Sequence, residues 1–253
     1  MFARQEVNLI RELVINEFKL KYKNSALGFF WSFLRPMSML AVLYIVFNLF
    51  IKINVKDYAL FLLFGIISWN FFAECTSVGL SSITSKSNIV KKINFKYEIL
   101  VLSAGLTSFI SFLLNFLVFF IILLFTKGLP KLIALYILLP VSGLLLIGFG
   151  LSFMLSTLFM KYRDISYVWE ALLQILFWLT PIAYPIEVVP ATYLRFYMLN
   201  PLAIIITVSR ELIINSRLTY VNLLILSMII ALIILIFGYT IYKRYHKGMI
   251  EYL

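Results

Sequence analysis

The feature that most constrains this chain is a series of long apolar runs. We place six of them at residues 36–51, 58–82, 99–126, 132–160, 165–183 and 220–242. A helix needs roughly twenty apolar residues to cross the core of a bilayer, and all six runs are near or above that length. With 63% hydrophobic and 13% charged residues, the 253-residue chain would expose a very large apolar surface in water. The sequence therefore predicts an all-α, polytopic membrane protein in which residues 1–253 form one domain.

The basic residues are distributed unevenly between the two sides of these spans. Of the 22 lysines and arginines, 15 lie in the N-terminal segment, around 84–97, around 161–164 and in the C-terminal tail. Because segments rich in Lys and Arg stay in the cytoplasm, we expect both termini there. The net charge of +11 is clustered beside apolar runs, where anionic lipid headgroups neutralise it. Membrane lipids are thus expected partners, and nucleic acid is not.

Residues 1–35 precede the first span and contain an amphipathic pattern. Val7, Ile10, Val14 and Phe18 form one helical stripe, while the opposite face is polar. This is typical of a helix lying in the membrane interface. We expect it on the cytoplasmic leaflet, followed by a turn and by Pro36 in the first turn of the next span.

The loop at residues 84–98, TSKSNIVKKINFKYE, lies between the second and third spans. It has four lysines against one carboxylate, and its apolar residues recur at three- and four-residue spacing. Two interpretations remain open, an ordinary cytoplasmic loop and a short helix that docks into a soluble partner. The residues that would form such a helix or its flanks are Lys86, Ile89, Val90, Lys91, Lys92, Ile93, Phe95, Lys96 and Tyr97.

Residues 184–219, with the prolines just before them, are interrupted too often to form another span. The prolines are Pro181, Pro185, Pro190 and Pro201. Broken backbone can lie at membrane depth only where protein or a wet cavity satisfies its polar groups. We predict a re-entrant pair of short helices on the outer side, broken near Asn200 and Pro201; the alternative is an amphipathic external loop resting on lipid.

Several kinds of chemistry have no residues to support them. The chain contains no G-x-x-x-x-G-K-[ST] sequence, so we expect it not to hydrolyse ATP itself. Its single histidine, His246, has no neighbouring metal ligands, and its two aspartates, Asp57 and Asp164, are expected on opposite sides of the membrane. We therefore predict no catalytic residues, no metal site and no cofactor in this chain.

Three carboxylates lie in or near the spans, namely Glu74, Glu98 and Glu170. Charged groups inside a membrane usually face a bundle interior or a wet cavity. Because all three are expected near the cytoplasmic boundary, structural hydrogen bonding or a pore-mouth role is favoured over a proton relay. Aromatic residues are also abundant, and some could line a conduit instead of packing between helices; the candidates are Trp69, Phe72, Phe177, Trp178 and Tyr184.

Five motifs, in order, resemble those of ABC-2-type permeases that export polysaccharide. The first joins a basic amphipathic helix to an L-G-x-x-W-x-x-x-x-P turn at Leu27, Gly28, Trp31 and Pro36. SNIVKKINFKYEILVLS resembles the family's loop between the second and third spans, although Lys96 replaces its usual proline. KYRDI, LTPIAYP and LNPL follow at plausible spacing, so the resemblance covers nearly the whole chain.

The resemblance implies a six-span subunit that forms a homodimer around a channel and pairs with two copies of a separate ATPase, which binds ATP and Mg. It implies a coupling helix at 84–98, an ATPase interface that includes Val7, Ile10 and Val14, and an external gate at 184–219. The implied cargo is a lipid-linked polysaccharide such as an O antigen, exported across the cytoplasmic (inner) membrane. Alternative cargoes for the same architecture are teichoic acid, a capsular polymer and a small hydrophobic drug. Two functions of other classes also remain open, a proton-coupled carrier and a structural membrane scaffold.

Overall fold

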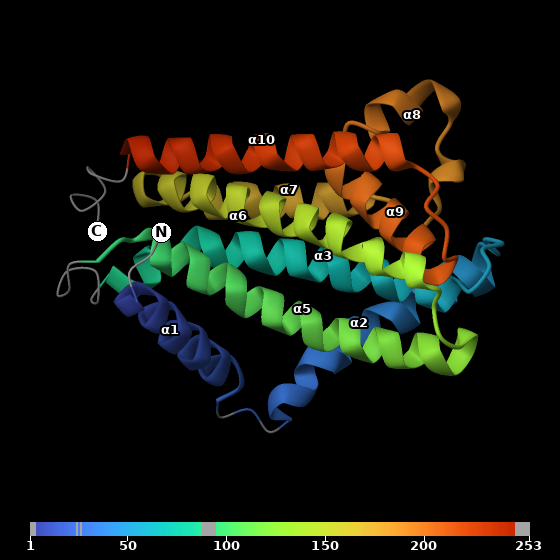
Figure 1. Cartoon of the computed structure of the whole chain (residues 1–253), viewed down its shortest axis with the longest axis horizontal. Coiled ribbons are helices and arrows are strands. Elements are labelled where there is room, and N and C mark those ends of the chain that lie inside the picture. The colour runs from blue at the N-terminus through green and yellow to red at the C-terminus, as the bar shows by residue number, and fades with distance from the viewer. Residues whose placement is uncertain (1–3, 24, 26, 88–94, 246–253) are drawn as a thin grey trace.

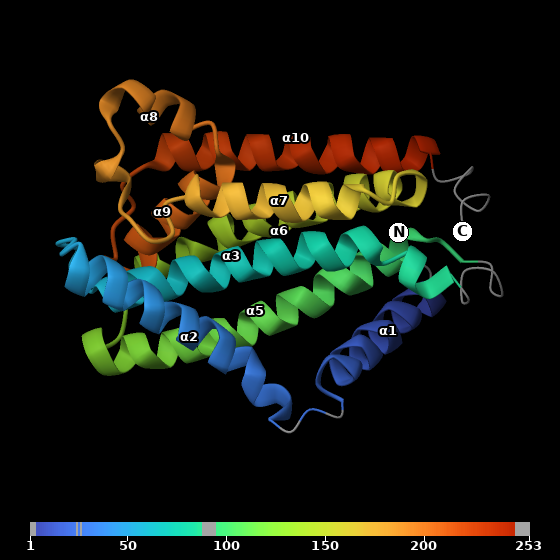
Figure 2. The ribbon, with the colours of Figure 1, turned by 180° about the vertical axis from the view of Figure 1, so that it is seen from behind.

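The computed structural model describes residues 4–23, 25, 27–87 and 95–245, and this part of the chain is a bundle of helices without a strand (Figure 1). The long helices run along a common direction. The beginning of α1 (Arg4–Tyr22) and the end of α10 (Val221–Tyr245) lie at the same end of the bundle, as Figures 1 and 2 both show. The predicted all-α class is confirmed for the described residues.

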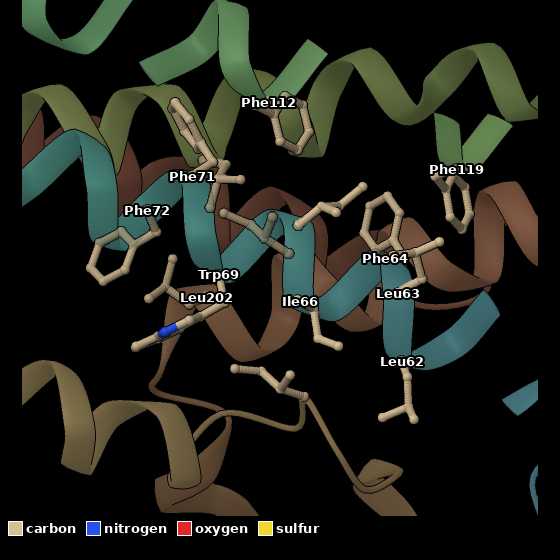
Figure 3. Close-up of a cluster of buried hydrophobic side chains, with 14 of the residues drawn as sticks. Leu62, Leu63, Phe64, Ile66, Trp69, Phe71, Phe72, Phe112, Phe119 and Leu202 are labelled. Atoms are coloured by element: carbon tan, nitrogen blue, oxygen red, sulfur yellow. The ribbon is translucent and has the colours of Figure 1, made fainter. Parts of the chain in front are cut away.

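Helix α3 (Tyr58–Ser81) is the centre of the bundle. It is apolar around its whole circumference, as expected of a helix covered by other helices or by lipid, and most of its residues are buried. Its neighbours are α2 (Trp31–Tyr44), α5 (Glu98–Lys127), α6 (Leu138–Lys161), α7 (Ile165–Trp178) and α9 (Pro201–Ile214). Figure 3 shows Phe64 and Phe71 of α3 pointing towards Phe112 and Phe119 of α5.

Among the described residues, five helices are long and apolar enough to cross a membrane. They are Gly28–Phe50, Tyr58–Ser81, Glu98–Lys127, Leu132–Lys161 and Val221–Tyr245. The first is a composite of a 3-10 turn (Gly28–Phe30), α2 and a π-helical turn (Ile45–Phe50), and it begins eight residues before the predicted start. The prediction that Pro36 lies in the first turn is therefore wrong: Pro36 is buried inside α2.

The expected span at 165–183 is shorter than predicted. Helix α7 ends at Trp178 after 14 residues, which is about 21 Å of helix. The apolar run continues through Leu179 to Ala183, but the backbone turns there, before Pro185. Hydropathy alone could not detect this end, because the residues after the break are as apolar as those before it.

After the turn, the chain forms two short helices separated at Asn200, as the prolines predicted. A 3-10 turn (Ile186–Val188) leads to α8 (Ala191–Tyr197) and then to α9. The Asn200 side chain caps α9 by accepting from the Leu202 backbone N–H at 3.0 Å, and Pro201 occupies the first turn. Most of α9 is buried, while α8 lies at the edge of the bundle (Figure 2).

Helices α6 and α10 approach so closely that their backbones touch. A Cβ added at Gly150 would meet the carbonyl oxygen of Ile234 at 2.7 Å, and one added at Gly238 would collide with the backbone of Gly150. Only glycine allows this contact. A 3-10 segment (Leu132–Ile137) precedes α6 and joins it to the end of α5.

Candidate functional site

The side of α1 that faces the bundle carries charged residues. The Glu17 carboxylate accepts hydrogen bonds from Ser103 Oγ at 3.1 Å and Thr107 Oγ1 at 3.0 Å, both on α5, and it pairs with Lys86. Ser103 and Thr107 are four residues apart and therefore lie on one face of α5. This carboxylate thus joins α1 to α5 and to the loop that follows α3.

A second ion pair lies one turn further along α1. Lys21 Nζ donates to Glu74 Oε1 at 2.6 Å and to Ser111 Oγ at 2.9 Å. Lys21 follows Glu17 by four residues and Ser111 follows Thr107 by four, so the two helices match their polar groups turn by turn. Glu74, a predicted pore-mouth residue, is therefore held by α1 at a position seven residues before the end of α3.

The predicted apolar stripe on α1 is only partly covered. Val14 is 8% exposed, Ile10 is half-buried, and Val7 is 54% exposed. The polar residues predicted on the outer face are exposed, but the buried face also includes Glu17. Helix α1 therefore packs on α5 through mixed polar and apolar contacts, and its place along the cytoplasmic leaflet stays a prediction.

The loop at 84–98 is described only at its two ends. Thr84–Lys86 forms a 3-10 turn, and Tyr97 precedes the first residue of α5. Phe95 and Tyr97 pack edge to face, with ring centroids 6.0 Å apart, and Lys96 pairs with Glu6 of α1 at 3.0 Å. The remaining predicted coupling residues lie outside the described residues; these are Ile89, Val90, Lys91, Lys92 and Ile93.

The break after α7 is stabilised by a buried arginine. Arg210 of α9 is 3% exposed and donates hydrogen bonds to the backbone carbonyls of Pro181 and of Ile182, the latter at 2.8 Å. Its guanidinium lies 3.5 Å from the ring centroid of Phe61. A Cβ at Gly65 would collide with this guanidinium, so the glycine leaves room for it.

Two tyrosines hold the same turn. Tyr58 donates to the Ala183 carbonyl at 2.5 Å, and Tyr184 lies within 2.5 Å of both the Trp178 carbonyl and the Tyr197 hydroxyl. Burial raises the pKa of Tyr197, and the contact with Tyr184 adds to that effect.

Asn200 completes the set of side chains at the turn. Its amide donates to Thr180 Oγ1 at 3.1 Å, while its side-chain oxygen caps α9. The first N–H groups of a helix have no partner within the helix, and the Asn200 side chain supplies an acceptor for one of them at the start of α9. The same side chain ties the start of α9 to the turn at Thr180.

A groove of about 360 Å³ lies between α2, α3 and α7. Trp69 and Phe177 form one wall, packed edge to face with centroids 5.7 Å apart. Arg35, Ser38 and Asn70 supply the polar groups of the lining. The arrangement places aromatic faces beside hydrogen-bonding side chains, a combination suited to a polar ligand with apolar faces.

The other predicted site residues are scattered. Phe72 is 1% exposed and packs against Trp69 and Trp169, so its ring is in the core and does not line a surface. Trp178 is exposed at the end of α7. Glu98 accepts from Tyr239 at 3.0 Å, and Glu170 lies exposed on α7. Pro181 is buried and Pro185 is half-buried at the turn.

Sequence reasoning missed four residues that organise these contacts: Glu17, Lys21, Tyr58 and Arg210. Arg210 was detectable, because it stands in the largely apolar run AIIITVSRELII, where a charged residue usually has a partner. Glu17 and Lys21 gave no such signal, since charged residues are ordinary in an amphipathic helix and their partners lie 53 to 90 positions away.

Comparisons with known proteins agree with this architecture. The family model described as ABC-2 type transporter matches residues 8–214. The chain is similar to an O-antigen export system permease protein RfbA of Klebsiella pneumoniae, 30% identical over 94% of this chain and 92% of that one. It is also similar to RfbA of Myxococcus xanthus (26%, covering 83% and 82%) and to the polysialic acid transport protein KpsM of Escherichia coli (22%, covering 98% and 97%). The match over most of its length shows that the chain belongs to the ABC-2 type transporter membrane family.

Proposed function

We propose that this chain is the membrane subunit of an ABC transporter that exports a lipid-linked polysaccharide, such as an O antigen, across the cytoplasmic membrane. One observation carries the proposal: the similarity to an O-antigen export permease extends over 94% of the chain and 92% of that relative. A bundle with five helices long enough to span a membrane is consistent with that role.

In the proposed topology, α7 and the turn up to Ala183 form a sixth crossing. Helices α8 and α9 then form the re-entrant segment on the outer side. Both termini lie in the cytoplasm, which the lysines and arginines at that side favour. The buried carbonyl contacts of Arg210 and Tyr58 support this assignment, because they satisfy broken backbone as the interior of a membrane requires.

Two copies of the chain would enclose the conduit. The exposed faces of α2 and α7 are apolar and flank the groove that contains Trp69 and Phe177. Packing these faces against a second copy would convert the open groove into part of an enclosed path. Sugar rings present C–H faces to aromatic rings, and Arg35 and Asn70 would meet their hydroxyls. The turn beside Asn200 is the proposed outer gate.

Two copies of a separate ATPase, holding ATP and Mg, would drive the cycle from the cytoplasmic side. The loop at 84–98 is the proposed contact, with residues 89–93 as its docking face. The Glu17–Lys86 pair gives that loop a direct connection to α1 and α5. Movement of the loop would therefore shift α1 together with the spans, as a rigid-body transition requires.

A capsular polymer is the alternative cargo, favoured by the similarity to KpsM over 98% of this chain. A proton-coupled carrier is disfavoured because Glu74, its best candidate for a relay, is paired with Lys21. In this structure the Glu74 carboxylate is a contact between α1 and α3.

Export in cells tests the function. We expect the chain, expressed with its ATPase in a strain that makes an O antigen but lacks the permease, to restore surface polymer measured by antibody labelling of intact cells. The double variant Ile89→Asp, Ile93→Asp should abolish surface polymer and leave chain abundance unchanged, whereas Ile89→Val, Ile93→Val should export normally. Polymer that stays inside the cell with the wild-type chain would contradict the proposal.

A further inference from the structure

A second groove opens between α5, α6 and α10, at the end of the bundle where α5 begins and α10 ends. It has a volume of about 490 Å³. Its wall is apolar and includes Leu102, Phe149, Leu235 and Ile236. It shares no lining residue with the groove that contains Trp69, whose walls are α2, α3 and α7. No step of the export mechanism uses it.

The rim of this groove carries opposite charges next to each other. Lys96 and Glu98 are two residues apart where the chain enters α5, and both line the groove. Glu98 Oε2 accepts from Tyr239 at 3.0 Å, which fixes the carboxylate at the rim. Lys96 is 56% exposed and pairs with Glu6 at 3.0 Å. The rim therefore presents an ammonium that is shared with Glu6, and an oriented carboxylate, above an apolar wall.

The packing of the three helices holds the groove open. Both α5 and α10 pack on α6, and the Gly150–Gly238 contact fixes α10 against α6. On the other side, Phe149 lies over Gly105 of α5, where a Cβ would collide with its ring. Because backbone contacts and a ring set these spacings, the groove is built into the fold and does not depend on a mobile side chain.

We propose that this groove binds a phospholipid whose headgroup carries both a phosphate and a primary ammonium, that is, phosphatidylethanolamine. The phosphate faces Lys96, the ammonium donates to Glu98, and an acyl chain lies along Leu102, Phe149 and Leu235. A choline headgroup has no N–H to donate to Glu98, and the glycerol headgroup of an anionic phosphatidylglycerol carries no positive charge to pair with that carboxylate. The charge pattern of the rim therefore selects the zwitterionic primary amine.

Lipid retention tests this assignment. The full chain is reconstituted in nanodiscs with equal parts of phosphatidylethanolamine, phosphatidylcholine and phosphatidylglycerol, washed in mild detergent, and analysed by native mass spectrometry. We expect retained phosphatidylethanolamine to exceed phosphatidylcholine about tenfold, the ratio that one charge-assisted hydrogen bond provides. Equal retention of the two, or a preference for phosphatidylglycerol, would overturn the proposal.

Two variants locate the site. Glu98→Gln keeps an acceptor for Tyr239 but removes the charge, and it should bring the ethanolamine-to-choline ratio close to one. Leu235→Trp fills the groove and should abolish retention, while Leu232→Trp, on the exposed side of the same helix, should retain lipid as the wild type does. Retention by Leu235→Trp, or an unchanged ratio in Glu98→Gln, would show that the lipid binds elsewhere.

Discussion

The guanidinium of Arg210 is buried on α9, and the groups around it are suited to a cation. It faces the carbonyls of Pro181 and Ile182 and lies on the ring of Phe61. Two carbonyls at a broken helix end would otherwise lack donors, and each buried acceptor without a partner costs about 1–3 kcal/mol. This single side chain therefore holds the end of α7 against α3 and α9.

Replacing Arg210 with leucine should lower stability by about 2–5 kcal/mol, because both carbonyls lose their donor. Arg210→Lys should lower stability by a smaller amount, since an ammonium can still donate to one carbonyl. Arg217→Leu is the matched control, because that arginine is exposed. Thermal unfolding in detergent measures all three; an Arg210→Leu protein as stable as the control would contradict the role of Arg210.

The pair Lys21–Glu74 should show measurable coupling. Both side chains are about one-third exposed, so the pair lies between surface and buried ion pairs, and we expect a coupling energy of about 1–2 kcal/mol. A double-mutant cycle with Lys21→Met and Glu74→Gln measures it in detergent. Additive effects of the two substitutions would show that the charges contribute independently.

At the scale of elements, α1 is an integral part of the bundle. Its polar residues Glu17 and Lys21 match Ser103, Thr107 and Ser111 of α5 turn by turn. The same carboxylate pairs with Lys86 in the loop after α3. Any displacement of that loop is therefore transmitted to α1 through a charged contact that is costly to break.

Glu17→Leu should release α1 from α5. The Ser103 and Thr107 hydroxyls would lose their acceptor and Lys86 its counter-charge, so amide hydrogen exchange in residues 4–22 should rise at least about fivefold, or about 1 kcal/mol of local opening. Glu12→Leu, on the exposed face of the same helix, is the control and should exchange as the wild type does. Unchanged exchange in Glu17→Leu would contradict this docking.

The contact between α6 and α10 depends on two glycines. Gly150→Ala should lower stability by about 1–3 kcal/mol, because the new methyl group meets the α10 backbone at 2.7 Å and cannot be accommodated by a rotamer change. In Gly148→Ala, two residues away, the new methyl group would lie 3.0 Å from the Cys75 sulfur, so this substitution should lower stability by a smaller amount. Thermal unfolding compares the two, and equal effects would contradict this explanation.

At the scale of the whole molecule, hydropathy predicted the long helices and the prolines predicted the interrupted segment after α7. The apolar runs located the five long helices, and Pro185 with Pro201 located the two short helices around Asn200. Hydropathy did not reveal the end of α7 at Trp178, because Leu179 to Ala183 stay apolar, although Pro181 is a signal for a helix end near that position. The turn itself is stabilised by Arg210 and Tyr58 from distant helices. Contacts between positions far apart in sequence leave no periodic pattern.

The aromatic residues of the candidate site were predicted only in part. Trp69 and Phe177 were predicted and do line a common groove, while Phe72, three residues from Trp69, is in the core. An apolar helix covered on every side gives no amphipathic signal to separate lining from packing residues. The docking loop remains a prediction, because residues 88–94 lie outside the described part.

The most direct test of the central claim is co-purification of this chain with its ATPase, followed by ATP turnover in proteoliposomes. The export account predicts a stable complex purified through a tag on this chain, with ATP hydrolysis that falls when residues 89 and 93 are replaced by aspartate. A chain that binds no ATPase would contradict the account, and Glu74 would then become the first residue to mutate in search of an ion-coupled carrier.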